Sequence, residues 1–133
     1  MAKAYLLTGD DRYRDHLILL WKDWIEQNPP LCGPNYLAPV EIGLRLLHWA
    51  AALRFLAARQ APDPELLTAL FGQVHFQRFT IADNLSRYSS ANNHLLGELA
   101  SLALADAAFP GLAPKAETDR WDAELQREVA LQF

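Results

Sequence analysis

Apolar residues recur every three or four positions along nearly the whole chain, and this spacing restricts the fold more than any other feature. In the segment 10–27, for example, Leu17, Leu20, Trp21 and Trp24 fall on one helical face. The usual strand signals are missing, because there is no alternating run of β-branched residues and no Asn-Gly or Asp-Gly dipeptide. The sequence therefore predicts an all-α protein.

Proline and glycine divide this pattern into separate helices. We expect helices over 10–27, 39–60, 64–88, 91–108 and from 117 to the C-terminus, the third with a pause at Gly72. Residues 28–39, NPPLCGPNYLAP, contain four prolines and are predicted to form a loop. The expected N-caps are Thr8 or Asp10 for the first helix, Asp63 for the third and Ser90 for the fourth. Five or six helices in 133 residues favour a single domain, 1–133, built as an antiparallel array.

Charge and composition argue against several classes of protein. Twelve Lys and Arg against 16 Asp and Glu give a net charge of −4, and without a basic cluster no nucleic-acid partner is expected. No apolar run approaches the roughly 20 residues of a membrane-spanning helix, so no membrane partner is expected. The single cysteine, Cys32, allows no intrachain disulfide and no Cys-based metal site, and no metal or cofactor is predicted. The first residues show no apolar signal core, and the location is left unassigned.

A narrow polar stripe runs along the otherwise apolar helix 39–60. Glu41, Arg45 and His48 are spaced i, i+4, i+7 and therefore share one face. In one interpretation the stripe faces solvent, and Glu41 pairs with Arg45 across one turn. In the other it lines a polar cavity, because a helix that is apolar on most sides is usually buried on most sides. Spacing alone does not decide between the two.

The stretch SSANNHLLGE, residues 89–98, opens another Leu- and Ala-rich helix with an unusual density of hydrogen-bonding groups. Capping by Ser90 and an i,i+4 pair of His94 with Glu98 would explain part of it. Buried amides and imidazoles need partners, however, and a helix N-terminus is well placed to receive an anion. We therefore predict that Asn93 and His94 face a ligand cavity shared with the stripe on 39–60.

Other chemistries find less support. His94 and Glu98 alone are too few ligands for a zinc site. Ser89 and Ser90 lack the spacing of a catalytic triad and fit helix ends and caps better. The remaining notable side chains are expected in the core or as sugar-stacking platforms (Trp21, Trp24, Trp49), at the cavity rim (Tyr36) and at the surface (Arg78, Arg87).

Two segments together carry a family resemblance. NPPLCGPNYLAPVEIGLRLLHWAAAL (28–53) and NLSRYSSANNHLLGELASLALADAAFP (84–110) resemble the N-terminal helical region of the heparinase II/III-like polysaccharide lyases, a group similar to the alginate lyases. The family's NPP, Gly-x-Asn-aromatic, Glu-x-x-x-Arg and Ser-x-x-Asn-Asn-His-x-x-Gly-Glu elements all occur here in order. The combination is fairly specific, and it extends from about residue 4 to 133.

The resemblance implies an incomplete α/α toroid of antiparallel helical hairpins around a substrate cleft. It also implies cleavage of a uronic-acid polysaccharide, of the heparin, heparan sulfate or alginate type, by β-elimination. The residues it implies as catalytic are Asn93, at the site of the substrate carboxylate, and His94 beside it. Together with the polar stripes it gives the expected substrate-binding residues: Asn35, Tyr36, Glu41, Arg45, His48 and Glu98. The expected partner is an acidic polysaccharide or oligosaccharide, and the family suggests a bacterial periplasmic or secreted location.

Two features of the family pattern do not occur in this sequence. The family has a catalytic tyrosine shortly after the last helix and a further histidine in a later β-sandwich domain. We therefore expect a fragment of a larger toroid with little or no lyase activity alone. The alternatives are a non-catalytic carbohydrate-binding or scaffold module, and a helical adaptor that forms homo-oligomers through exposed apolar helix faces.

Overall fold

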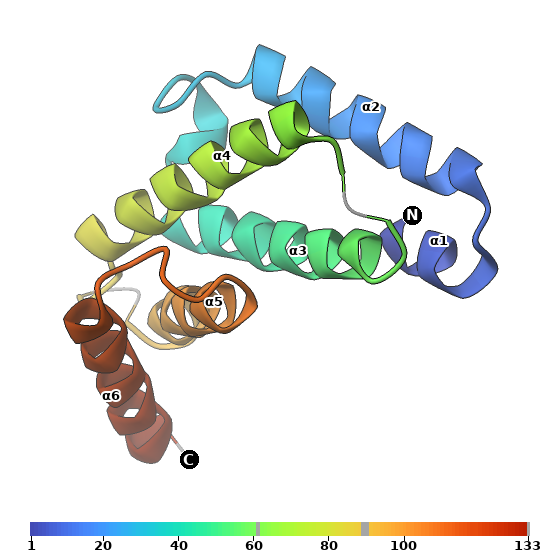
Figure 1. The fold of residues 1–133 in the computed structure, drawn as a ribbon. Coiled ribbons are helices and arrows are strands. Elements are labelled where there is room, and N and C mark those ends of the chain that lie inside the picture. Colours follow the sequence, from blue (N-terminus) through green and yellow to red (C-terminus); the bar gives the residue numbers. More distant parts are fainter. Residues whose placement is uncertain (61, 89–90, 133) are drawn as a thin grey trace.

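Six α-helices and one short 3₁₀ turn make up the computed structural model of the chain, which describes residues 1–60, 62–88 and 91–132 (Figure 1). The α-helices are α1 (Ala2–Thr8), α2 (Asp11–Gln27), α3 (Pro39–Ala57), α4 (Pro64–Asp83), α5 (Asn93–Ala108) and α6 (Lys115–Gln132). The 3₁₀ turn, η1, covers Pro34–Tyr36. The residues described contain no strand, which confirms the predicted all-α class.

Side-chain caps set two of the helix starts as the sequence predicts. The Asp10 carboxylate accepts the Arg12 backbone N–H at 3.0 Å at the start of α2. The Asp63 carboxylate accepts the Leu66 N–H at 2.9 Å at the start of α4. Each bond satisfies one of the backbone donors that a first helical turn leaves without a partner.

Several boundaries differ from the prediction. The sequence does not predict α1 or η1, because each is too short to show a clear apolar period. α4 continues through Gly72 without a pause, since the fully buried Leu70 and Val74 on either side hold that segment in the core. It also ends at Asp83 rather than at about residue 88. There the chain turns away, and Ser86 hydrogen-bonds to Glu98 of α5.

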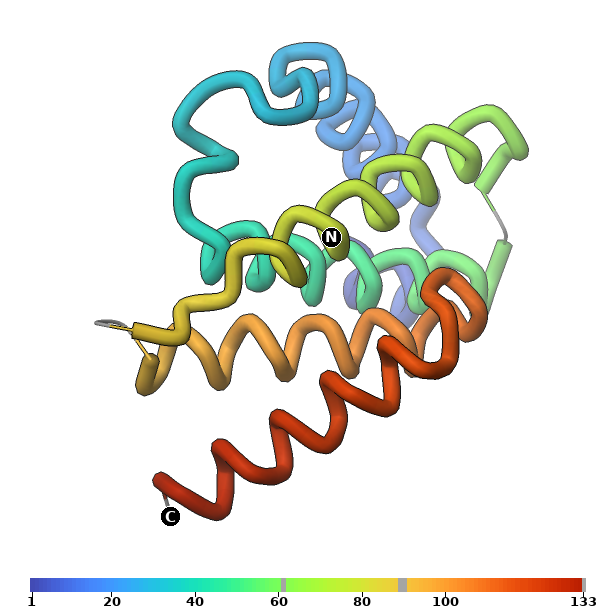
Figure 2. Tube along the Cα trace, turned by 90° about the vertical axis from the view of Figure 1, so that its left-hand side faces the viewer, coloured from blue at the N-terminus to red at the C-terminus, as the bar shows by residue number. Residues whose placement is uncertain are grey.

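Consecutive helices from α3 to α6 run antiparallel, whereas α3 and α5 lie side by side and point the same way (Figure 2). Small residues allow this close approach. A β-carbon added to Gly43 would lie 2.7 Å from Ser101 Oγ, and one added to Gly97 would lie 3.5 Å from the Val40 side chain. The parallel pairing means that α3 and α5 begin at the same end of the molecule. The antiparallel hairpins agree with expectation, and their closure into a toroid stays a prediction.

The core consists of two adjoining clusters of buried side chains. One lies between α3, α4, α5 and α6 and includes Ile42, Leu46, Val74, Leu99 and Leu102. The other lies between α1, α2, α3 and α4 and includes Trp21, Trp49, Leu53, Leu56 and Leu70. Trp121, on the mostly polar α6, is also buried and packs into the first cluster. Trp21 and Trp49 thus lie in the core as expected.

Arg78 is buried, which corrects the prediction that it lies at the surface. Its side chain is only 3% exposed, and Nη2 donates to Asp106 Oδ1 at 3.1 Å. The guanidinium also lies 5.5 Å from the ring centroid of Trp121. Burial lowers the pKa of Arg78, while the negative charge of Asp106 opposes this shift. A neighbouring carboxylate and an aromatic face therefore make an interior position possible for this cation.

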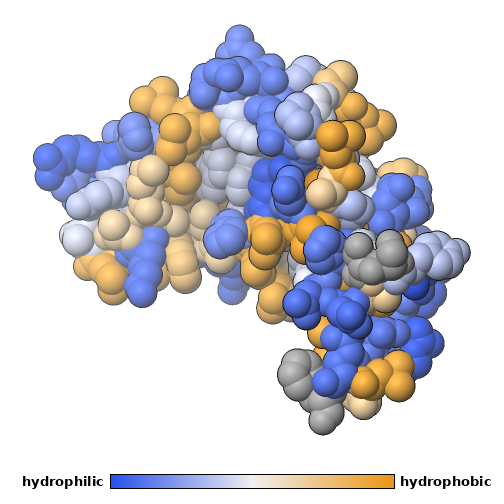
Figure 3. Space-filling view, turned by 180° about the vertical axis from the view of Figure 1, so that it is seen from behind, coloured by the Kyte–Doolittle hydropathy of each residue, from blue (hydrophilic) through white to orange (hydrophobic). Residues whose placement is uncertain are grey.

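The surface mixes hydrophobic and hydrophilic side chains, as the view from behind shows (Figure 3). In that view α6, at the lower right, is largely hydrophilic, whereas hydrophobic residues gather over the other helices. Exposed leucines include Leu19 and Leu20 of α2 and Leu44 of α3. None of the helices described here combines the length and hydropathy that a membrane span requires.

Candidate functional site

The starts of α3 and α5 bring the two predicted polar stretches to one end of the molecule (Figure 2). Asn35 and Tyr36 lie in loop 28–38, which leads into α3, and Asn93 and His94 form the first turn of α5. This common placement follows from the parallel pairing of α3 with α5. It is the arrangement that a cavity shared by the two stretches requires.

Arg45 connects more elements than any other side chain predicted for the site. Its Nε donates to Gln77 Oε1 of α4, and its Nη1 donates to the Asn35 carbonyl, both at 3.1 Å. The guanidinium carbon lies 4.7 Å from the ring centroid of Trp24 and 5.2 Å from that of Tyr36. These are cation–π distances. Arg45 therefore joins α2, α3, α4 and loop 28–38.

Tyr36 is buried, where the sequence led us to expect a side chain at the cavity rim. Its hydroxyl lies 3.3 Å from both the Asn28 carbonyl and Gln73 Oε1. A tyrosine hydroxyl has one proton, so it donates to one of these acceptors at a time. Asn35, the preceding residue, is exposed, and its side-chain amide donates to Asn28 Oδ1. Of this pair, only Asn35 is open to solvent.

Burial changes the acidity of Tyr36 and Arg45 in opposite directions. It raises the pKa of Tyr36, and the positive charge of Arg45 opposes that shift. It lowers the pKa of Arg45, and the charges of Tyr36 and Glu41 oppose that shift. Arg45 Nη2 and Gln77 Nε2 are in addition buried, and neither has a hydrogen-bond partner among the residues that the structure describes. Such groups are uncommon in folded proteins and reduce stability.

Asn93 and His94 are both exposed at the start of α5. The N-cap is Asn92, whose side chain makes no capping hydrogen bond, and the predicted cap Ser90 lies outside the described residues. The positive end of the helix dipole and its first backbone N–H groups are therefore on the same side as the Asn93 amide and the His94 imidazole. Together these groups can donate hydrogen bonds to an anion.

Glu98 is fully buried one turn further along α5. Its two carboxylate oxygens accept the backbone N–H and the hydroxyl of Ser86, each at 2.7 Å. A loop N–H that is turned inward needs an acceptor, and Glu98 supplies it. This carboxylate therefore fixes the chain after α4 relative to α5.

The two i,i+4 ion pairs of the simpler interpretation do not form. Within the described part of the chain, neither Glu41–Arg45 nor His94–Glu98 is among the salt bridges within 4.0 Å. Arg45 binds across to α4, and Glu98 binds back to Ser86. Glu41 itself is exposed at the start of α3. Contacts between segments distant in sequence thus replace the expected pairs along each helix.

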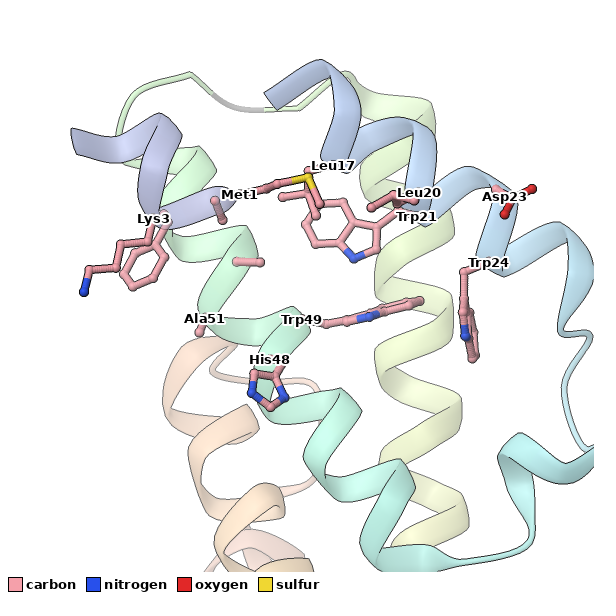
Figure 4. Close-up of a pocket in the computed structure, with 13 residues that line it drawn as sticks. Met1, Lys3, Leu17, Leu20, Trp21, Asp23, Trp24, His48, Trp49 and Ala51 are labelled. Atoms are coloured by element: carbon pink, nitrogen blue, oxygen red, sulfur yellow. The ribbon is translucent and has the colours of Figure 1, made fainter. Parts of the chain in front are cut away.

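His48 lies at the edge of an aromatic cavity (Figure 4). This cavity of about 580 Å³ opens between the start of α1, α2 and α3, and its walls include Leu17, Leu20, Trp21, Trp24, Trp49 and Phe55. His48 is exposed, with Nδ1 2.7 Å from the Leu44 carbonyl. The half-buried Trp24 lines the cavity and also contacts Arg45. Trp24 therefore joins the cavity to the Arg45 cluster.

Sequence reasoning misses several residues that hold this site together. Gln73 and Gln77 of α4 bind Tyr36 and Arg45, Asn28 binds Asn35 and Tyr36, and Ser86 binds Glu98. The two glutamines carry a signal that is visible in the sequence, since amides four residues apart interrupt the apolar face of α4. No cluster of three or more potential metal ligands occurs among the residues that the structure describes.

Comparison with known proteins places the chain in a family. The family described as Heparinase II/III N-terminus matches residues 1–133, and the chain belongs to it. A heparin-sulfate lyase of Bacteroides stercoris is 28% identical over 130 residues, covering 83% of this chain and 19% of the relative. A heparin-sulfate lyase of Bacteroides thetaiotaomicron is 30% identical over 112 residues, covering 82% of this chain and 16% of the relative. The chain thus spans less than a fifth of these relatives, and no solved structure matches it.

Proposed function

We propose that this chain forms the helical substrate-cleft portion of a polysaccharide lyase that acts on uronic-acid polysaccharides by β-elimination. Family membership and two relatives named heparin-sulfate lyases support a lyase-related module. Because those relatives carry that name, we propose a glycan of the heparan sulfate type ahead of alginate. The activity belongs to the longer polypeptide, and residues 1–133 alone are expected to show little or none.

The observation that carries this proposal is the common end at which α3 and α5 begin (Figure 2). It supports a single cleft that has Asn35 and Glu41 on one side and Asn93 and His94 on the other. Asn93 and His94 are the proposed catalytic residues of this chain. The proposed substrate-binding set is Asn35, Tyr36, Glu41, Arg45, His48 and Glu98, in which the exposed members reach the sugar and the buried members form the wall behind them.

The chemistry of β-elimination suits an amide and a helix N-terminus. A base removes the proton on C5 of the uronate, the C4–O bond breaks, and a double bond forms between C4 and C5. The leaving oxygen on C4 takes a proton from an acid. Removal of the C5 proton places negative charge on the adjacent carboxylate. The Asn93 amide, the His94 imidazole and the first N–H groups of α5 would stabilise that charge.

Asn93→Ala in the full natural polypeptide tests this assignment, with Asn92→Ala as the matched control. Both residues are exposed asparagines, and the Asn92 side chain makes no capping bond whose loss would weaken α5. We expect Asn93→Ala to lower kcat on heparan sulfate about 100- to 1000-fold, as removal of an oxyanion-stabilising donor does. Asn92→Ala should stay within about threefold of the wild type, a change of under 1 kcal/mol in barrier height. Absorbance of the unsaturated uronate product measures both.

The activity assay, combined with calorimetry of glycan binding, distinguishes the proposed lyase function from the alternatives. Equal activity of the two variants would contradict the role of Asn93. A full-length wild type that binds heparan sulfate oligosaccharides in calorimetry but forms no unsaturated product would instead favour the non-catalytic binding module.

A further inference from the structure

We propose that Gln73 and Gln77 are positioning residues of the candidate site, acting on loop 28–38 through Tyr36 and Arg45. This inference rests on the proposed function for its effect on substrate, but the hydrogen-bond geometry that carries it does not depend on that function. The two glutamines lie one turn apart on α4 and are 7% and 0% exposed. Neither belongs to the loop or helix that carries the proposed substrate contacts.

Each glutamine contacts a different member of the site. Gln73 Oε1 lies 3.3 Å from the Tyr36 hydroxyl, and Gln77 Oε1 accepts from Arg45 Nε at 3.1 Å. Arg45 in turn donates through Nη1 to the Asn35 carbonyl. An unbroken series of hydrogen bonds therefore runs from Gln77 through Arg45 to the backbone of Asn35, an exposed residue that is proposed to meet the glycan.

The geometry of Arg45 shows why the acceptor on α4 matters. The Trp24 and Tyr36 rings lie 4.7 and 5.2 Å from the guanidinium carbon, but these contacts do not determine where its N–H groups point. The hydrogen bond from Nε to Gln77 orients the guanidinium with Nη1 directed at the Asn35 carbonyl. Without this acceptor, the link between α3 and loop 28–38 should weaken.

Stability alone does not account for this arrangement. Gln77 Nε2 and Arg45 Nη2 are both buried and have no hydrogen-bond partner within 1–60, 62–88 and 91–132, so the amide brings a desolvated donor into the core together with its acceptor. An apolar side chain of similar size would avoid that donor, but it would leave Arg45 Nε without its acceptor on α4. A role in holding Arg45 gives a reason for an amide here.

Gln77→Met, compared with Gln126→Met on the exposed face of α6, provides the test. Methionine keeps approximately the length of the side chain and removes the acceptor. The first readout needs no substrate: hydrogen exchange of the Tyr36 and Leu37 amides, which bond to the Gly33 and Pro34 carbonyls within the loop. We expect exchange at these amides to rise about tenfold in Gln77→Met, with the α5 amides unchanged. Gln126→Met should match the wild type throughout.

The second readout is kinetic and uses the full natural polypeptide with heparan sulfate. Gln77→Met should raise KM about tenfold and change kcat less than threefold, because the loop positions substrate and does not transfer protons. Gln73→Met should have a smaller effect, since the Tyr36 hydroxyl keeps the Asn28 carbonyl as an acceptor. If Gln77 only stabilised the fold, Gln77→Met would lower the urea midpoint of unfolding without raising KM selectively over kcat.

The outcomes separate the two proposals. Unchanged exchange in Gln77→Met, or equal changes in Gln126→Met, would overturn the positioning role whatever the enzyme does. Faster exchange with unaltered KM in an active enzyme would also overturn it, because the loop would then not serve the site. If the wild type has no lyase activity, the proposed function fails, and the exchange comparison still decides whether Gln77 holds the loop.

Discussion

Arg45 and Glu98 are charged residues that perform similar structural tasks on two parallel helices. Arg45 reaches back from α3 to the Asn35 carbonyl, and Glu98 reaches back from α5 to the N–H and hydroxyl of Ser86. Each side chain thus satisfies polar groups in the loop that precedes its own helix. Hydrogen bonds to charged groups are stronger than those between neutral groups. The geometry of each loop therefore depends in part on one charged residue of the helix that follows it.

Replacing Glu98 by glutamine should measure the strength of its attachment to Ser86. The amide keeps the size of the side chain but loses the charge and one of the two acceptors that Ser86 uses. We expect a loss of about 1.5–3 kcal/mol in the free energy of unfolding, measured by urea denaturation. Glu117→Gln, at an exposed position in the first turn of α6, serves as the control. Equal losses in both variants would contradict the prediction.

Tyr36 should make the protein sensitive to alkaline pH. Burial raises its pKa in the folded chain above the ordinary value of 10.0. The unfolded chain therefore loses this proton first, so the stabilisation is complete below about pH 10 and declines as the pH rises through the folded pKa. Tyr36→Phe removes the titrating group, and its urea midpoint should fall less between about pH 8 and pH 11 than that of the wild type. The exposed Tyr13→Phe should behave like the wild type.

At the scale of the helices, the sequence predicts which helices exist better than it predicts where each one ends. Apolar spacing locates α2 to α6, and aspartate caps give the starts of α2 and α4. The end of α4 is not predictable in this way, because it depends on the distant acceptor Glu98. The same limit applies to the site. Spacing places Glu41, Arg45 and His48 on one face, but it cannot reveal that Gln77 or Ser86 is the actual partner across the molecule.

Two helical glycines should respond to alanine in opposite ways. Gly72 is exposed in α4 and has nothing within 4 Å of an added β-carbon, so Gly72→Ala should raise the free energy of unfolding by about 0.5–1 kcal/mol. Gly43 lies where α3 crosses α5, and its new β-carbon would meet Ser101 Oγ at 2.7 Å. Gly43→Ala should therefore lower the free energy of unfolding by about 1–3 kcal/mol.

The glycine comparison has an internal check. The double substitution Gly43→Ala with Ser101→Ala removes the hydroxyl that the added carbon meets. It should recover part of the loss that Gly43→Ala alone causes. No recovery would mean that the approach of α3 to α5 is not limited by this contact.

At the scale of the whole molecule, the aromatic cavity is a feature that lies outside the proposed site apart from its one shared residue, His48. It has mostly apolar walls and opens beside exposed residues such as Leu20. Open apolar surface of this kind favours association. We therefore expect residues 1–133 to self-associate at high concentration in sedimentation velocity experiments.

Two charge substitutions should locate the associating surface. Leu20→Glu places a charge at the cavity and should leave the protein monomeric. Leu131→Glu, at an exposed position near the end of α6, should associate like the wild type. A wild type that stays monomeric at all concentrations would rule out association through this surface. So would identical behaviour of the two variants.

Loop 28–38 has one more property of practical use, because it contains Cys32, the only thiol in the sequence, and that thiol is exposed. An environment-sensitive dye coupled there would sit three residues from Asn35. Its emission could follow glycan binding in real time without the introduction of any foreign reactive group elsewhere.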